Sequence, residues 1–396
     1  MTGFALDAEQ RAFFDRVRSI AADQLRPLAE AGVPGRVNRE LIKEMGRLGL
    51  LSRLFPGVSG GPSLSREAAL SREAAAMDLC LLREALATQS TEAETALALQ
   101  GLGSYPVLQS GQEEVVRRWL PAVAAGDAVA AFALTEPEAG SDAAALTLRA
   151  ERDGAGWRLT GEKIWISNAP EADFYTVFAR TTVGAGARGV SAFVVPGDRP
   201  GLSGEHLDMI SPHPIGRLVF DGVPVQGTEL LGEPDRGFRV AMRTLDLFRP
   251  SVGAFAVGMA QAAIDAAVAH AGSRTAFGGP LKDQQAVSHL LAEMATRTEA
   301  ARLLVYAAAG AYDSGGGLGA GGGLGEKRIA AKSAMAKLFA TETAQFVVDA
   351  AVQIHGARAL RRGHLLEHLY REVRAPRIYE GASEVQRTII ARELYR

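Results

Sequence analysis

The chain of 396 residues contains one cysteine, Cys80, so no disulfide can form within it. A single free thiol is typical of a reducing environment, and we expect an intracellular, cytoplasmic protein. The formal net charge of −2 gives no reason to expect nucleic acid or an anionic membrane as a partner. No apolar run reaches the roughly 18 residues of a membrane span, and the N-terminal residues lack the pattern of a signal peptide. The sequence therefore predicts a soluble protein.

Several motifs of common enzymes are also missing. No group of histidine, cysteine and carboxylate residues has the spacing of metal ligands, and no Gly-x-Ser-x-Gly elbow is present. The glycine-rich stretch 314–325 is not followed by Gly-Lys-Ser/Thr, so it is not a phosphate-binding loop. We expect it to be a flexible connection between two helices.

The composition, with 47% hydrophobic and 22% charged residues, is typical of a globular protein, and the length suits two or three domains. The periodicity changes from helical to strand-like near residue 128 and back to helical near residue 237. We therefore predict an α+β fold of three segregated domains. These are an N-terminal helical domain (1–127), a middle antiparallel β-barrel or sandwich (128–236) and a C-terminal four-helix bundle (237–396).

Local signals give the expected elements. Turns are expected at 57–62 and 103–106, a helix from Glu113 should stop at Pro121, and a turn at Gly161-Glu162 should separate two strands. The expected strands are 157–160, 163–166, 174–179, 190–195 and 217–220. The expected bundle helices are 251–270, 284–312, 327–354 and 363–370.

Two motifs belong to the predicted β-domain. The stretch 132–142, Phe-Ala-Leu-Thr-Glu-Pro-Glu-Ala-Gly-Ser-Asp, combines hydroxyls with a proline turn, and its donors suit an electron-rich ring or a phosphate. In 161–168, Trp165 and Ser167 alternate with isoleucines and are expected on one strand face, where they could form a wall against a flat cofactor. Each motif alone is also compatible with an ordinary turn or a core tryptophan.

Three motifs belong to the predicted bundle. The stretch 274–281 offers an arginine fork suited to a diphosphate and a phenylalanine for stacking. The stretch 353–357 places a glutamine and a tight turn at a helix end, with His355 expected to be a lone structural histidine. Ile378-Tyr379-Glu380-Gly381 places a carboxylate on a glycine-hinged turn, where loss of water would make it a proton acceptor. Taken alone, that carboxylate is more often simply solvated.

Together and in this order, these motifs resemble the acyl-CoA dehydrogenase family of flavoproteins, and the resemblance covers nearly the whole chain, 7–396. It implies an FAD-dependent oxidoreductase of fatty acid metabolism that converts an acyl-CoA thioester to a trans-2-enoyl-CoA. It also implies electron-transfer flavoprotein as the electron acceptor. The implied assembly is a homo-oligomer, usually a tetramer, in which each subunit reaches the FAD of a neighbour.

The resemblance assigns roles to individual residues. Glu380 is implied to be the catalytic base that removes the α-proton, with the Ser167 hydroxyl near N5 of the flavin. The residues implied to bind FAD are Phe132, Leu134, Thr135, Gly140, Ser141, Trp165, Ser167, Arg274, Phe277, Gln285, Gln353 and Gly356. The residues implied to contact the substrate are Ser141, Asp246, Arg249, Tyr379 and Gly381.

The chain departs from the family pattern at several positions. Phe248 stands where isovaleryl-type relatives carry their base and cannot take a proton, so Glu380 is the remaining candidate. The stretch 209–214 replaces a Gly-x-Arg motif near the CoA, which leaves a carrier-protein thioester open as the substrate. Ser167 replaces a threonine, and Ala357 replaces a glycine. The sequence is also compatible with a flavin oxidase of the same fold that uses dioxygen, and with a flavin-binding protein without turnover.

Overall fold

The computed structural model describes residues 6–55, 75–315 and 324–395. Its internal contacts divide the chain into two compact units. Unit 1 comprises Met1–Arg26, Ala75–Glu94 and Asp246–Arg396, and unit 2 comprises Pro27–Ala74 and Thr95–Leu245. The turn expected at 57–62 and most of the glycine-rich stretch 314–325 lie outside the described residues.

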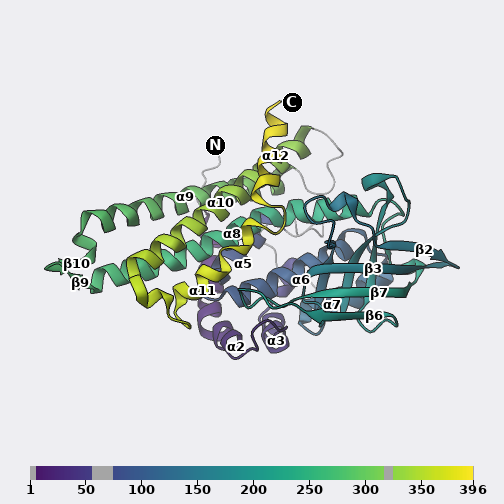
Figure 1. Cartoon of the computed structure of the whole chain (residues 1–396), viewed down its shortest axis with the longest axis horizontal. Helices are drawn as coiled ribbons and strands as arrows, with labels where there is room; N and C mark the ends of the chain where they lie inside the picture. Colours follow the sequence, from purple (N-terminus) through teal and green to yellow (C-terminus); the bar gives the residue numbers. More distant parts are fainter. Residues whose placement is uncertain (1–5, 56–74, 316–323, 396) are drawn as a thin grey trace. The chain divides into compact units, whose positions relative to one another are not determined.

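Unit 1 is helical. Figure 1 shows its long helices α9 and α10 running alongside each other, and they pack together along their lengths. The helix α10 also packs against the two helices that follow it, α11 and α12. The helices of this unit are α1 (Ala8–Ile20), α5 (Ala76–Ala87), α8 (Gly237–Ser273, of which the part up to Leu245 belongs to unit 2), α9 (Gln285–Gly315), α10 (Leu324–His355), α11 (Leu365–Glu372) and α12 (Ser383–Leu394), with the π-helical turn η1 (Ala21–Leu25) after α1.

The helix α5 lies in the core of unit 1. Every residue from Ala76 to Ala87 is buried except Met77, and the helix packs against α1 and α9. A helix that is buried on all sides reads as apolar on all sides, which is why its sequence has no amphipathic pattern. Three of the buried side chains are nonetheless charged: Asp78, Arg83 and Glu84.

The helix α8 is long and apolar enough to cross a membrane, but 72% of its most apolar window is buried within the protein, as in a core helix. Glycines let it approach its neighbours: a Cβ at Gly253 would lie 2.7 Å from a methyl carbon of Val305 in α9. The expected start at residue 251 was wrong, because the helix begins at Gly237 and continues through Pro250. Buried residues before the proline, such as Leu247 and Phe248, extend its apolar face and offset the cost of an interior proline.

Unit 2 contains an eight-stranded sheet in the order β6-β7-β3-β2-β4-β5-β8, with β1 paired to β4. Most pairs are antiparallel, as predicted, but β1 and β2 each pair with β4 in parallel. Its strands are β1 (Ala130–Ala133), β2 (Arg149–Asp153), β3 (Gly156–Ser167), β4 (Phe174–Arg180), β5 (Val190–Pro196), β6 (Leu202–His206), β7 (Ile215–Val225) and β8 (Leu230–Leu231). The helices of its described part include α2 (Arg26–Glu30), which begins at the unit boundary, α3 (Arg39–Arg47), α6 (Thr91–Ser110), whose residues up to Glu94 belong to unit 1, and α7 (Glu113–Ala125).

The expected turn at Gly161-Glu162 was wrong, because β3 runs without interruption from Gly156 to Ser167. Gly161 has φ +141°, and a Cβ there would lie 3.0 Å from the Cα of Leu148. The glycine thus marks a shift of register within one strand and a close backbone approach, and no chain reversal occurs there.

Two predicted helix ends were also wrong. The expected turn at 103–106 lies inside α6, where a Cβ on Gly103 would come within 2.7 Å of the Ala131 nitrogen. The glycine therefore serves close packing of the helix on β1. The helix α7 continues through Pro121 and ends at Gly126, which has φ +76° and caps the helix in the left-handed conformation.

Candidate active site

Glu380 lies on a short loop between the 3₁₀ turn η8 (Ala375–Arg377) and α12. Its φ is +51°, and that of the following Gly381 is +95°. A left-handed backbone is routine for glycine but costs a glutamate roughly 1–2 kcal/mol. Such strain persists where the surrounding structure enforces it, most often at functional sites. The loop therefore orients Glu380 at a cost to stability.

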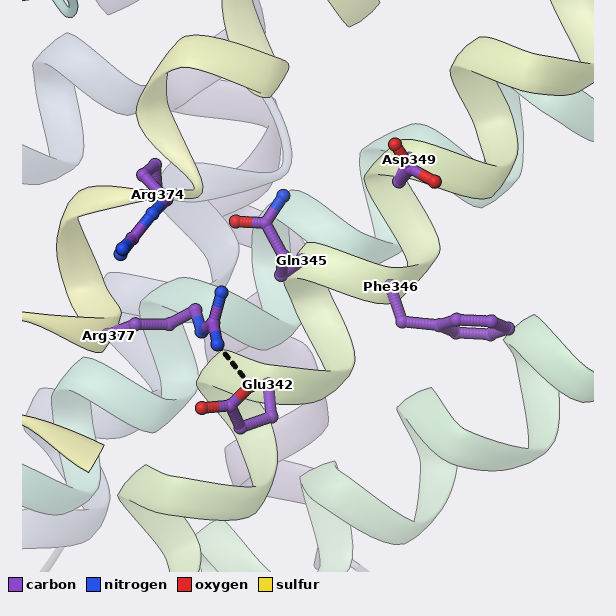
Figure 2. A pocket seen from close by; sticks show the side chains of 6 residues that line it. All are labelled: Glu342, Gln345, Phe346, Asp349, Arg374 and Arg377. Atoms are coloured by element: carbon purple, nitrogen blue, oxygen red, sulfur yellow. Dashed lines mark ion pairs between the residues drawn. The ribbon is translucent and has the colours of Figure 1, made fainter. Parts of the chain in front are cut away.

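The helix α10 enforces this conformation from both sides of the loop. Nζ of Lys337 donates a hydrogen bond of 2.8 Å to the carbonyl oxygen of Gly381. Glu342, one turn further along, forms an ion pair of 2.9 Å with Arg377 before the loop and accepts a hydrogen bond of 2.7 Å from Ser383 after it. Figure 2 shows Arg377 reaching across to Glu342. Both ends of the Glu380 loop are thus fixed to one rigid helix.

The environment of the Glu380 carboxylate makes it more basic than an ordinary glutamate. Burial raises its pKa, while Arg83, Lys337 and Arg249 act to lower it, and the net shift is upward. Its Oε2 atom is buried and has no hydrogen-bond partner among the described residues. A buried carboxylate oxygen without a donor is poised to accept a proton.

Arg249 and Asp246 form an ion pair one helical turn apart on α8, at 2.6 Å. Arg249 is buried, whereas Asp246 is one-third exposed. Nε of Arg249 is buried without a partner in the described part of the chain. A buried guanidinium N–H without an acceptor is costly unless a ligand completes it. The expected pairing of these two residues is therefore present, together with an open donor.

Arg83 and Glu94 form a buried ion pair that was not predicted from the sequence. Arg83 also donates a 2.8 Å hydrogen bond to Ser251, whose hydroxyl donates to the carbonyl oxygen of Phe248 at 2.7 Å. The pair is thereby linked to the turn of α8 that carries Arg249. The available signal was the placement of an arginine within the apolar sequence of α5. Lys337 was missed in the same way, as a fully buried lysine in α10.

The hairpin formed by β9 (Thr275–Ala276) and β10 (Gly279–Pro280) carries the predicted cofactor residue Phe277 at its tip. Figure 1 shows the hairpin beyond the ends of α8 and α9. Phe277 and Gly278 both have positive φ, +54° and +87°, as a type I′ turn requires. The phenylalanine is 93% exposed, which is unusual for a large aromatic residue in a strained backbone. Arg274 and Gln285, on either side of the hairpin, are also exposed.

The end of α10 presents the exposed Gln353 and Gly356, the latter with φ +64°. The prediction that His355 between them is a lone histidine was wrong. Its ring stacks on His270 of α8 with 4.2 Å between centroids and meets His364 edge-on at 5.5 Å. Since the backbone N–H of Arg274 donates to the carbonyl oxygen of His270, the stack brings the hairpin and the end of α10 together.

In unit 2, the loop after β1 is organised by a buried ion pair. Glu136 accepts hydrogen bonds from the backbone N–H groups of Thr147 and Leu148, at 2.6 and 3.0 Å, and from Nζ of Lys163 at 2.8 Å. Lys163 also donates to the carbonyl oxygen of Leu134 at 2.8 Å. Burial acts to raise the pKa of Glu136, but Lys163 and the backbone donors hold it below its usual value. The loop is thus fixed in one conformation by a fully satisfied carboxylate.

This fixed loop displays the other predicted residues of its motif. Leu134 is buried, and Phe132 packs against Phe178 with 4.9 Å between ring centroids. Thr135 is partly buried, while Gly140 and Ser141 are exposed on the loop. The start of the loop is therefore buried and fixed, while hydrogen-bond donors at its tip, at Gly140 and Ser141, are accessible.

Trp165 stands at a bulge of β3 with φ +59° and leaves 51% of its surface exposed. Bulges re-aim side chains and are frequent beside active sites. The expected simple alternation of Trp165 and Ser167 on one face is interrupted by this bulge. The Ser167 hydroxyl lies 2.8 Å from Nε2 of His213, a residue of the stretch 209–214 that departs from the family pattern. Burial lowers the pKa of His213 to about 4, so the imidazole is neutral at neutral pH.

A pocket of about 530 Å³ lies beside the Glu380 loop (Figure 2). The pocket is lined by residues of α10 and of the segment around η8. None of these lining residues was predicted to belong to the site. The lining residues are Glu342, Gln345, Phe346, Asp349, Arg374 and Arg377. Within the described residues no group of histidine, cysteine and carboxylate side chains is arranged to hold a metal ion.

The predicted cofactor residues fit a flavin nucleotide in their chemistry. A half-exposed indole at a strained bulge offers a flat apolar face, and the exposed loop of Gly140 and Ser141 offers donors. Arg274 and Phe277 offer an exposed guanidinium and an exposed ring, which suit a diphosphate and a stacked base.

Three family models match consecutive parts of the chain: the N-terminal domain of acyl-CoA dehydrogenases at residues 7–127, the middle domain at 131–223 and the C-terminal domain at 235–395. Cyclohexane-1-carbonyl-CoA dehydrogenase of Geobacter metallireducens is 33% identical over 99% of this chain and 98% of its own length. The mitochondrial short-chain specific acyl-CoA dehydrogenase of Bos taurus is 36% identical over 95% of this chain and 88% of its own.

Solved structures share the fold over nearly the whole chain. Butyryl-CoA dehydrogenase from Megasphaera elsdenii superposes with a TM-score of 0.89 at 32% identity, covering all of both chains. A chain in the structure of the electron transferring flavoprotein of Acidaminococcus fermentans gives 0.89 at 33%, again covering all of both. Glutaryl-CoA dehydrogenase from Mycobacterium smegmatis, in complex with FADH2, gives 0.84 at 26%, covering 98% of this chain and 95% of its own.

The matched models span almost the entire sequence, and the relatives align from end to end. The predicted α+β fold is confirmed as the fold of these enzymes. The chain belongs to the acyl-CoA dehydrogenase family, whose members are flavin-dependent oxidoreductases with FAD as their cofactor.

Proposed function

We propose that the protein catalyses the α,β-dehydrogenation of an acyl-CoA thioester to a trans-2-enoyl-CoA, with Glu380 as the base. The observation that carries this proposal is the state of Glu380. Its backbone is held in a strained conformation by α10, and its buried Oε2 atom has no donor within the described chain. Backbone strain of this kind is typical of functional sites, and a buried carboxylate oxygen without a donor can accept a proton.

In the proposed reaction, the Glu380 carboxylate takes the α-proton while the β-carbon loses a hydride, so that a C=C bond forms between the two carbons. FAD supplies the acceptor for that hydride when it is bound. The raised pKa of Glu380 matches the base to its task, because proton transfer is most efficient when the pKa lies near the working pH. The backbone N–H of Glu380 polarises the thioester carbonyl and acidifies the α-proton, which is typically worth about 3 kcal/mol per donor.

The remaining site residues hold cofactor and substrate. Phe132, Leu134, Thr135, Gly140, Ser141, Trp165 and Ser167 line the FAD of the same subunit. Arg274, Phe277, Gln285, Gln353 and Gly356 reach the FAD of a neighbouring subunit, which agrees with the exposed, strained Phe277. Ser141, Asp246, Arg249, Tyr379 and Gly381 contact the substrate.

This sharing of FAD requires an oligomer, and we propose a homotetramer. We further propose electron-transfer flavoprotein as the electron acceptor and the cytoplasm as the location. The three-domain division at residues 127 and 236 is part of the same proposal.

The test is anaerobic mixing of the FAD-loaded protein with saturated acyl-CoA thioesters, followed by the flavin absorbance near 450 nm. Bleaching together with formation of enoyl-CoA is expected. An FAD-loaded protein that no thioester bleaches would contradict the proposal. Rapid reoxidation of the bleached protein by air would instead identify an oxidase.

A further inference from the structure

The feature of unit 2 that the proposed reaction leaves unexplained is the contact between Ser167 and His213. The Ser167 hydroxyl lies 2.8 Å from Nε2 of the imidazole. A hydroxyl has one proton to donate and two lone pairs that can accept, so a single bond uses only part of its capacity. Within the described residues, neither side chain has a second hydrogen-bond partner. The hydroxyl therefore keeps the capacity to bond to a ligand.

The imidazole of His213 is held in place by the backbone on both sides of it. The residue stands between Pro212 and Pro214, whose rings fix φ at about −65°. Its own N–H donates to the carbonyl oxygen of Ser211 at 2.8 Å, and the carbonyl oxygen of Pro214 accepts from the N–H of Asn168 at 2.8 Å. The imidazole thus projects from a constrained segment that is bonded to the end of β3.

Ser167 is held by the sheet. It is paired with Ile215 of β7, and the side chain of the buried residue that follows it, Asn168, donates to the carbonyl oxygen of Ala130 in β1 at 2.9 Å. Hydrogen-bonding groups that are fixed in advance need no rearrangement when the charge on a ligand changes. The hydroxyl and the imidazole are therefore a preorganised pair.

The imidazole is neutral at neutral pH. Burial lowers the pKa of His213 to about 4. A neutral imidazole carries its hydrogen on one of its two ring nitrogens, so Nε2 can either donate to a hydroxyl or accept from it. The hydroxyl can then donate to an acceptor on a ligand or accept from a donor. This versatility suits a flavin, because the ring nitrogen that takes up a hydride is an acceptor when oxidised and an N–H donor when reduced.

We propose that His213 is a positioning residue that fixes the Ser167 hydroxyl against the hydride-accepting nitrogen of FAD and thereby sets the reduction potential of the cofactor. This role rests on the proposed function, in which Ser167 lines the FAD. It goes beyond that function by giving a task to the stretch 209–214, which departs from the family pattern. Hydrogen bonds to the ring nitrogens are one means by which a protein tunes the electronics of a cofactor.

The test is a double-mutant cycle on the FAD-loaded protein without substrate. Reductive titration against a reference dye gives the midpoint potential of the flavin, and the absorption spectrum gives a second signature. Ser167→Ala should shift the potential, and His213→Phe, which keeps a ring but no nitrogen, should shift it in the same direction. Adding His213→Phe to Ser167→Ala should cause no further shift, because no hydroxyl is then left to position.

Two further variants separate positioning from a general disturbance of the loop. His213→Gln keeps an amide that can both donate and accept, so it should keep the potential of the parent protein. The matched control is His206→Phe, at the end of β6 before the same loop, where the ring nitrogen lies 3.4 Å from the Glu171 carboxylate. It should also leave the potential unchanged. If His213→Phe retains no FAD, the smaller His213→Leu takes its place.

Three results would overturn the role of His213. The first is a His213→Phe protein with the potential of the parent, or with a shift that adds fully to that of Ser167→Ala. The second is an unshifted Ser167→Ala protein, since the hydroxyl would then not contact the flavin. The third is an equal shift in His206→Phe, which would be an effect of the whole loop. The proposed function is tested separately, because it fails only if no acyl-CoA thioester bleaches the flavin.

Discussion

Nζ of Lys337 donates to the carbonyl oxygen of Gly381 at 2.8 Å, and the same carbonyl accepts from the Gln386 side chain at 2.8 Å. The peptide that follows Glu380 is therefore fixed by two side chains, one of them a buried cation. Burial lowers the pKa of Lys337 to about 8, with Glu380 acting to raise it. A single lysine thus both holds the loop and sets the charge beside the base.

The first prediction concerns the base. Glu380→Gln keeps the shape of the side chain but cannot accept the proton, so the rate of anaerobic bleaching should fall by about 10²–10⁴-fold. Stopped-flow absorbance of the flavin measures this rate, and the FAD content of the purified variant serves as the control. Bleaching at the rate of the parent protein would show that another group takes the proton.

The second prediction concerns pH. Because the pKa of Glu380 is raised, kcat/KM should fall as the pH decreases through a value above that of an ordinary glutamate. The Lys337 charge lowers this pKa, so Lys337→Met should raise it and move the acid-side inflection to higher pH. Lys337→Arg keeps the charge and should leave the inflection near its original position. An unmoved inflection in the Met variant would exclude electrostatic coupling between the two residues.

The third prediction concerns the loop anchor. Glu342→Gln removes the charge that pairs with Arg377 and bonds to Ser383, so it should cost about 1–2 kcal/mol of unfolding free energy. The rate of bleaching should fall as well, because Glu380 is held less firmly. Urea denaturation measures the free energy of unfolding, and stopped-flow absorbance of the flavin measures the rate of bleaching. Asp349→Asn, an exposed position in the same pocket, is the control and should change neither.

The fourth prediction concerns the loop of unit 2. Lys163→Met leaves the Glu136 carboxylate buried without its cation and should cost about 3–5 kcal/mol. Lys43→Met removes an ion pair with Asp127 that is exposed on both sides, and should cost less than about 1 kcal/mol. Equal changes in the urea midpoints of the two variants would mean that burial does not determine how much stability is lost when the Lys163–Glu136 pair is broken.

The fifth prediction concerns the hairpin. Phe277→Ala removes a ring that is 93% exposed, so the folded subunit should lose almost no stability. If the ring contacts the FAD of a neighbour, the variant should nonetheless retain less FAD after gel filtration. Absorbance at 450 nm relative to 280 nm measures this ratio. Full retention would place Phe277 outside the cofactor site.

The sequence allowed the fold class and the motif positions to be predicted because these depend on local patterns. Changes of periodicity located the helical and strand regions, and glycine beside a carboxylate marked the Glu380 loop. Helix ends were predicted poorly where packing overrides a breaker, as at Pro121 and Gly103. Both residues are ordinary turn formers, and only the tertiary contacts of α6 and α7 keep them helical.

The partners of Glu380 could not be predicted for a different reason. Arg83 and Lys337 are far from it in the sequence, and each sits in an apolar helix where a charge has no local explanation. Their position near Glu380 follows from the packing of α5 on α9 and of α9 on α10, which no short-range pattern encodes. The prediction for His355 failed likewise, since His270 lies on another helix.

The central helix of unit 1, α5, has a consequence for synthesis of the chain. Part of its apolar surface is covered by α1, which precedes it, and part by α9, which is translated only after the whole of unit 2. At typical elongation rates of about 5–20 residues per second, the surface that α9 covers stays exposed for on the order of ten seconds or more. Transiently exposed apolar surface of this kind favours aggregation and the binding of chaperones. Yield of the active protein should therefore depend on the speed of translation between α5 and α9 more than on the stability of the finished fold.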